Sequence, residues 1–229
     1  MTLKKNNIQC ILLCLLFFSP LRFIFAAQFI NNNLKEFSLS IQNQTTYFDY
    51  ATKTYEVKTD QIGINWYEWL SKSFQGGLEY GYTDMTQINN PVASGKFSSG
   101  QFFGLLLRFM PIEQTYLSLA FNLNYRYNKT ESKNNSLTSE FVWHESLFSS
   151  ELELYPQDKI SLLLAAEYLS LSGEQRNFGS TGQIMQFSTS KYLGYRIGLD
   201  FKPYPTAHIG LEWQAGYRDG FRVYFKRKF

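Results

Sequence analysis

The chain ends with Phe221-Arg222-Val223-Tyr224-Phe225-Lys226-Arg227-Lys228-Phe229, a stretch in which apolar and polar side chains alternate. The apolar row, interrupted only by Arg227, is Phe221, Val223, Phe225 and Phe229. A period of two residues is typical of a β-strand with one apolar face and one polar face. The stretch therefore predicts a closing strand that ends on an aromatic residue.

The same alternation recurs upstream and predicts a series of antiparallel hairpins. It is found in residues 37–41, 62–66, 78–82, 103–109, 117–127, 148–154, 160–168, 193–201 and 209–217. Pro111, Pro156 and Pro203 each end one alternating stretch shortly before the next begins, as prolines at strand ends do. Residues 86–100, 128–140 and 173–191 are longer polar links. Short turns at one end and long loops at the other are typical of a transmembrane barrel.

The fold class that follows is all-β: an antiparallel up-and-down transmembrane β-barrel of about ten strands, with eight as the alternative. A soluble barrel or sandwich also alternates in this way. Tyrosine and tryptophan near the strand ends, such as Tyr82 and Trp213, favour the membrane barrel because these residues gather at membrane interfaces.

The aromatic closing strand and the hairpin series resemble bacterial outer-membrane β-barrels of the OmpA-membrane-domain and opacity-protein group. The resemblance implies that the chain is a monomer in the outer membrane, in contact with its lipid and with lipopolysaccharide. It also implies that the barrel-assembly machinery recognises the terminal strand as its signal. The residues of that signal would be Phe221, Val223, Phe225 and Phe229.

Residues 1–26 have the features of a secretory signal peptide, which leaves residues 27–229 as the barrel. Two lysines precede an apolar run that ends in small residues. Both cysteines, Cys10 and Cys14, lie in this segment, so the mature chain is expected to have no thiol chemistry. The segment also contains Lys4, Lys5 and Arg22, so the 22 basic residues fall to 19 and equal the 19 acidic ones. A neutral mature chain argues against nucleic acid as a partner.

The polar row of the predicted strands supplies charges to the lumen. These are Glu79, Arg108, Arg126, Glu151, Glu153, Glu167, Arg196, Asp200, Glu212 and Arg222. A barrel of eight to ten strands has an interior little wider than its side chains, so opposite charges are expected to pair and fill it. The alternative is a narrow polar channel in which these residues act as a filter.

Enzymatic chemistry has one candidate, His144 and Ser146, because some outer-membrane lipid A-modifying enzymes use His and Ser near the outer leaflet. The deacylase pattern requires Asn after the Ser, and Leu147 stands there instead. With two isolated histidines, no metal site and no cofactor are expected. The expected role is structural or surface-interacting, with outer loops that meet a host or surface ligand. A small channel or porin is the first alternative, and a lipid A-modifying enzyme is the second.

Overall fold

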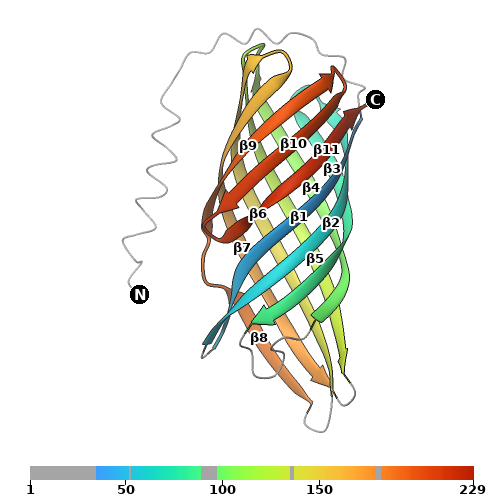
Figure 1. Ribbon diagram of the computed structural model, residues 1–229, viewed down its shortest axis with the longest axis vertical. Coiled ribbons are helices and arrows are strands. Elements are labelled where there is room, and N and C mark those ends of the chain that lie inside the picture. The colour runs from blue at the N-terminus through green and yellow to red at the C-terminus, as the bar shows by residue number, and fades with distance from the viewer. Residues whose placement is uncertain (1–34, 52, 89–96, 135–136, 179–181) are drawn as a thin grey trace, which may run out of the picture.

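A computed structural model describes residues 35–51, 53–88, 97–134, 137–178 and 182–229. These residues form one antiparallel β-structure that is rolled into a tube (Figure 1). The expected signal peptide and both cysteines lie outside the described residues. The strands are β1 (Glu36–Tyr50), β2 (Lys53–Ser71), β3 (Phe74–Ile88), β4 (Phe97–Glu113), β5 (Leu117–Asn134), β6 (Leu137–Gln157), β7 (Ile160–Phe178), β8 (Gln183–Thr189), β9 (Leu193–Tyr204), β10 (Ala207–Ala215) and β11 (Arg218–Lys228).

The tube is closed by the first and last strands. β1 pairs with β11 from Glu36 opposite Lys228 to Thr46 opposite Arg218. The backbone amides of Lys35 and Phe229 each donate to the other residue's carbonyl oxygen, at 3.1 and 2.9 Å. The expected closing strand and its pairing are therefore confirmed, and neither β1 nor β11 has a free edge along this stretch. We call the end that holds Lys35 and Phe229 the inner end, and the opposite end the outer end.

The strands are staggered around the tube. We start at Ile41 on β1 and move from each residue to its cross-strand partner on the next strand. Through β2, β3, β4, β5 and β6 this path reaches Glu174 on β7. Partners followed from Ile41 in the other direction, through β11, β10 and β9, lead to Leu162 on β7. Glu174 and Leu162 are twelve positions apart on the same strand. A stagger of this kind requires the strands to tilt across the barrel axis, as they do in closed barrels.

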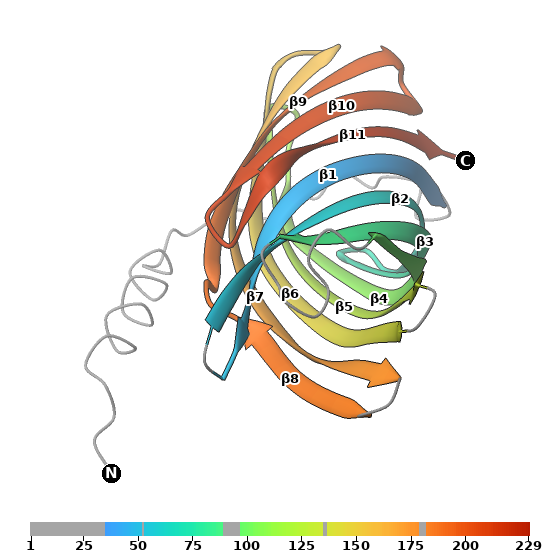
Figure 2. The same ribbon diagram turned by 60° about the horizontal axis from the view of Figure 1, so that its bottom comes forward.

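The wall has ten strands at the inner end and eight at the outer end. β7 pairs with β9 along its inner half and with β8 along its outer half. β8 then closes directly onto β1 through the three pairs from Phe48–Thr189 to Tyr50–Phe187. Figure 2 shows β8 beside β7 and apart from the β9–β10–β11 group. We call the part of the tube that includes β9, β10 and β11 the inner section, and the part built only from β1 to β8 the outer section.

The inner section is apolar outside and polar inside. Its outward side chains include Ile41, Leu199 and Leu211, which are 59%, 56% and 55% exposed in the isolated chain. Burying this surface in lipid is favourable. A closed barrel also satisfies the backbone groups that lipid cannot. The described residues contain no helix long and apolar enough to cross a membrane.

The outer section is mixed on both faces. Its outward residues include Lys58 and Lys129, and its interior holds an apolar cluster beside buried polar side chains such as Gln87 and Gln175. On β1, for example, the inward row runs through Gln44 and Thr46 and then changes to Phe48. We call the interior group the apolar plug; its members are Phe48, Val57, Met85, Phe141, Trp143, Leu169, Leu171, Phe187 and Tyr217.

Three local expectations are wrong. The Asp219-Gly220 pair predicts a tight turn into the closing strand, but both residues lie in β11, opposite Thr45 and Gln44. The reversal occurs just before them at Gly216, whose positive φ of 109° suits glycine. The polar links expected at residues 128–140 and 173–191 are largely strand. In the first, β5 continues to Asn134 and β6 begins at Leu137. In the second, β7 continues to Phe178 and is followed by β8.

Candidate functional site

The densest cluster of charged side chains among the described residues lies in the lumen of the inner section. Every charged residue expected there lies on an inward-facing strand position and is buried or half-buried, with its charge in an ion pair. These residues come from β3 to β7 and from β9 to β11: Glu79, Arg108, Arg126, Glu151, Glu153, Glu167, Arg196, Asp200, Glu212 and Arg222.

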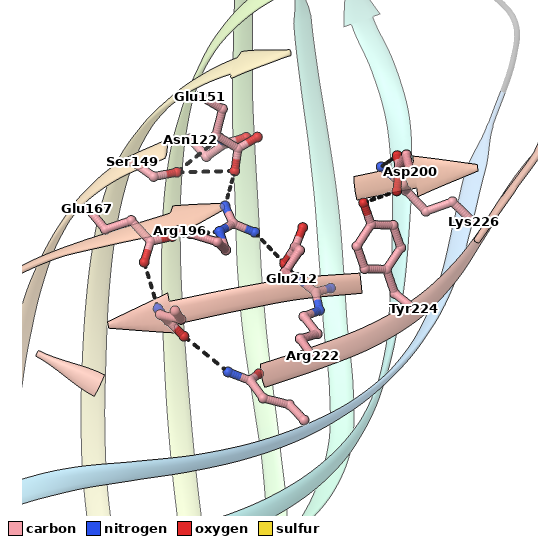
Figure 3. A network of polar contacts seen from close by, with 12 residues as sticks. Asn122, Ser149, Glu151, Glu167, Arg196, Asp200, Glu212, Arg222, Tyr224 and Lys226 are labelled. Atoms are coloured by element: carbon pink, nitrogen blue, oxygen red, sulfur yellow. Dashed lines mark hydrogen bonds and ion pairs between the residues drawn. The ribbon is translucent and has the colours of Figure 1, made fainter. Parts of the chain in front are cut away.

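Arg196 on β9 is the centre of the network (Figure 3). Its guanidinium group is 3.0 Å from Glu167 and 2.9 Å from Glu212, and it also contacts Glu151. Two further arginines share these acids. Arg108 lies 3.1 Å from Glu151, and Arg222 lies 3.6 Å from Glu212. Because each carboxylate has a cation within reach, the desolvation cost of the buried charges is largely offset.

A second group of ion pairs lies nearer the outer end. Arg126 on β5 makes two hydrogen bonds to the carboxylate of Glu79, at 2.7 and 2.9 Å, a geometry that guanidinium groups favour. Its guanidinium carbon also lies 4.4 Å from the centre of the Phe102 ring. Beyond it, Glu145 binds Arg218 at 2.5 Å and accepts a hydrogen bond of 2.7 Å from the indole of Trp143.

The sequence pattern does not identify Glu145 and Arg218 as lumen residues. Glu145 stands between His144 and Ser146, the pair that suggests enzymatic chemistry, and Arg218 directly precedes the Asp-Gly pair that suggests a turn. The signal for Glu145 was present, because it shares the parity of Glu151 and Glu153 on the same strand.

The inner end of the lumen holds a third charged group. The carboxylate of Asp200 lies 3.4 Å from the ammonium of Lys226 and 3.7 Å from Nδ1 of His208, and it accepts a hydrogen bond from the Tyr224 hydroxyl. Nearby, Glu153 faces the ammonium of Lys202 at 3.9 Å. His208 therefore lies inside the barrel wall next to an acid.

A polar cavity of about 120 Å³ lies between these groups. Ser38, Ser40 and Asn65 line one side of it, and the arginine network lines the other. A water molecule needs roughly 10–15 Å³ of such space, so the cavity has room for several. Arg108 and Arg222 line it, and the Nε atom of each is buried without a hydrogen-bond partner among the described residues. The cavity is therefore suited to water.

The apolar plug closes the lumen on the outer side of this cavity. Phe48 stacks on Phe187 with ring centres 4.4 Å apart and meets Trp143 edge-on at 6.1 Å, so β1, β6 and β8 are in contact across the tube. Tyr217 joins the plug to the polar network. Its hydroxyl donates to Glu167 at 2.7 Å.

His144 and Ser146 lie on the outer surface of the barrel, not in the lumen. The hydroxyl of Tyr125 and Nδ1 of His144 share a hydrogen bond of 2.6 Å. No hydrogen bond joins His144 to Ser146. Among the described residues, no group of three or more His, Cys, Asp or Glu side chains could hold a metal ion.

Comparisons with known proteins agree on the fold. No family model matches the chain, and no curated protein matches it in sequence. Among solved structures, the outer membrane protease OmpT from Escherichia coli is 9% identical, covers 90% of this chain and 99% of its own, and has a TM-score of 0.54. The translocator domain of the autotransporter NalP from Neisseria meningitidis is also 9% identical, covers 98% and 96%, and has a TM-score of 0.51.

These likenesses, together with the closed wall and the apolar outer face, define the class. The chain has the fold of a small bacterial outer-membrane β-barrel. At 9% identity the two structures establish the fold alone, and they assign neither proteolysis nor translocation to this chain.

Proposed function

We propose that the protein is a non-conducting anchor in the outer membrane that carries a surface-exposed outer section with a structural or surface-interaction role. The observation that supports this proposal best is the double closure of the lumen. The inner section is crossed by ion pairs centred on Arg196, and the outer section is filled by the apolar plug.

Ion flow would require both closures to open. Separating Arg196 from its three acids would leave buried charges unpaired, which costs several kcal/mol. The plug contains Trp143 and Phe141, which are each 1% exposed, so it is packed without access to solvent. A closed resting state is therefore favoured over an open pore.

The outer section provides the surface for interaction. Beyond the apolar band, the outward-facing residues Lys129, Glu140 and Arg176 form a ladder of charges, with ion pairs of 2.9 and 3.4 Å. Such a face suits polar partners in water, including lipopolysaccharide sugars or a host or surface ligand. The outward row of β11, ending in Phe229, is available to the barrel-assembly machinery before the barrel closes.

Planar bilayer recordings of the refolded chain test the proposal. We expect the wild type to show no steady conductance. Phe48→Ala combined with Trp143→Ala removes the two aromatic rings that meet across the tube, which opens the centre of the plug and should produce conductance steps. Trp213→Ala, on the lipid-facing side, is the matched control and should stay silent.

The competing function is a small channel, and the polar cavity of about 120 Å³ is the observation that favours it. Steady conductance in the wild type would support the channel and refute the closed anchor. Analysis of lipid A from cells that express the protein addresses the enzymatic alternative in parallel. Altered acylation that depends on His144 would replace the proposal with an enzyme.

A further inference from the structure

The lipid-facing surface of β5, β6 and β7 carries a two-row grid of polar side chains. Tyr125 lies opposite Ser146, which in turn lies opposite Ser170. One row further out, Tyr127, His144 and Ser172 are aligned in the same way. All of them point away from the lumen. We call this grid the hydroxyl face; its members are Tyr125, Tyr127, His144, Ser146, Ser170 and Ser172.

The grid lies at the boundary between lipid and water. The row on its inner side, Leu123–Phe148–Tyr168, belongs to the apolar band. The row on its outer side, Lys129–Val142–Glu174, begins the charged outer section. The hydroxyl face therefore sits at the level of the lipid head groups, where tyrosine side chains are commonly found.

Aromatic rings form a platform on one side of the face. The His144 ring stacks on Tyr125 with centres 5.8 Å apart, and it lies 5.2 Å from the Tyr127 ring. The bond of 2.6 Å between the Tyr125 hydroxyl and Nδ1 fixes the imidazole on this platform. Its other nitrogen, Nε2, takes no part in that bond.

The other side of the face offers hydroxyl groups. Ser146, Ser170 and Ser172 are exposed, and none of them has a side-chain hydrogen bond within the described part of the chain. A hydroxyl turned towards lipid without a partner costs free energy. A ligand with several hydroxyls and a flat ring face would satisfy the serines and stack on the aromatic platform.

Charged residues around the lipid–water boundary indicate which lipid head groups are favoured at the hydroxyl face. On β2 and β3 the outward rows pass from the apolar band to Asp60 and Asp84, which lie directly opposite each other. On β11 the corresponding residue is Asp219. These acids repel anionic head groups from that side of the barrel. The hydroxyl face is a neutral stretch of the same boundary, so a head group that is recognised by its sugar is favoured there.

We propose that the hydroxyl face binds the sugar head group of an outer-leaflet glycolipid. This inference rests on the proposed location in the outer membrane and names a specific lipid site for it. Sugar hydroxyls exchange hydrogen bonds with Ser146, Ser170 and Ser172, and the apolar face of a sugar ring packs on Tyr125 and His144.

Native mass spectrometry of the full refolded chain in a sugar-free detergent tests the site. The probe is a diglucosamine lipid A, with phosphatidylglycerol as the competing lipid. The test variant is Ser146→Leu with Ser170→Leu, which removes two opposed hydroxyls from the face. The control is Ser150→Leu with Ala166→Leu, an opposed pair on the same two strands within the apolar band. Both variants add apolar surface towards lipid and should fold.

We expect the wild type and the control to bind lipid A more tightly than phosphatidylglycerol. The test variant should lose about tenfold in lipid A affinity, as the loss of two hydrogen bonds predicts. His144→Phe, which keeps an aromatic ring, should lose less. Equal affinity of wild type and test variant, or no preference for lipid A over phosphatidylglycerol, would overturn the site. Because heat-modifiable gel migration and conductance are measured on the same samples, failure of this site is distinguishable from failure of the closed anchor.

Discussion

Arg196→Met is the substitution whose effect the lumen predicts most directly. Methionine retains much of the side-chain length and volume of arginine but removes every hydrogen-bond donor of the guanidinium group. Three buried carboxylates, those of Glu151, Glu167 and Glu212, then lose their shared cation. The barrel wall and its backbone pairing are left unchanged, so the effect isolates the ion-pair network.

The magnitude depends on which acids keep a partner. Glu151 retains Arg108 at 3.1 Å, and Glu212 retains Arg222 at 3.6 Å. Glu167 retains only neutral donors, the Tyr217 hydroxyl and the Gln214 amide, so it becomes a buried carboxylate without a cation. Breaking a buried pair costs about 3–5 kcal/mol. Because two of the three acids are compensated, we expect a loss near the lower end, about 3 kcal/mol.

Denaturant unfolding of the barrel in lipid vesicles, followed by heat-modifiable gel migration and tryptophan fluorescence, gives this loss. Arg176→Met is the matched control. Arg176 also contacts two acids, Glu140 and Glu174, but its side chain is 44% exposed. Water screens such pairs, so the control should lose about 0–1 kcal/mol.

A second substitution tests the cause. Glu167→Gln removes the carboxylate that Arg196→Met leaves without a cation, so the double variant should be more stable than Arg196→Met alone. If Arg196→Met and Arg176→Met cost the same, the lumen charges are hydrated well enough to be screened. The reasoning from buried pairs would then be refuted, and the channel would gain support.

The arrangement of the barrel wall gives three further predictions. Ile197→Arg places a charge in lipid and should lower the free energy of unfolding in vesicles by about 2–4 kcal/mol. Asn122→Arg enters the polar cavity and should lower it less; equal losses would mean that the lipid and lumen faces are misassigned. Deleting Phe229 should slow assembly in cells but not refolding in detergent, and deleting all of β11 should prevent both, as heat-modifiable migration would show. Gly220→Ala should weaken closure in the same assay, because its Cβ would lie 2.1 Å from the carbonyl oxygen of Asn43.

The inner section could be predicted almost entirely from the sequence. Alternation such as Phe37–Ser38–Leu39 assigns each residue to lipid or lumen, and a closed barrel then requires the first and last strands to pair. The turn before β11 could not be placed in this way. Asp219 and Gly220 form a common turn pair, but Gly220 is a glycine because the backbone of β1 passes close to it. Gly216 provides the turn instead.

The outer section was harder to predict because both of its rows are partly polar. On β5 the outward Lys129 and Glu131 alternate with the inward Asn128 and Thr130, so hydrophobicity shows no period of two there. The stretch therefore has the composition of a loop. Its strand structure depends on partners from β4 and β6, which only the closed register provides.

The reversal of polarity along single strands explains how one chain can both span lipid and close its own lumen. In the inner section the apolar row of each strand faces lipid. The other row faces the lumen, so it is polar and its charged side chains must be paired. Where β10 and β11 end, the wall narrows from ten strands to eight and the outward row meets water. Side chains alone can fill the interior of an eight-stranded tube. Inward-facing positions in this part of the wall can therefore carry apolar residues that pack as an ordinary core. The plug formed by Phe48, Trp143 and their neighbours therefore lies in the part of the wall that is narrow enough for side chains to fill.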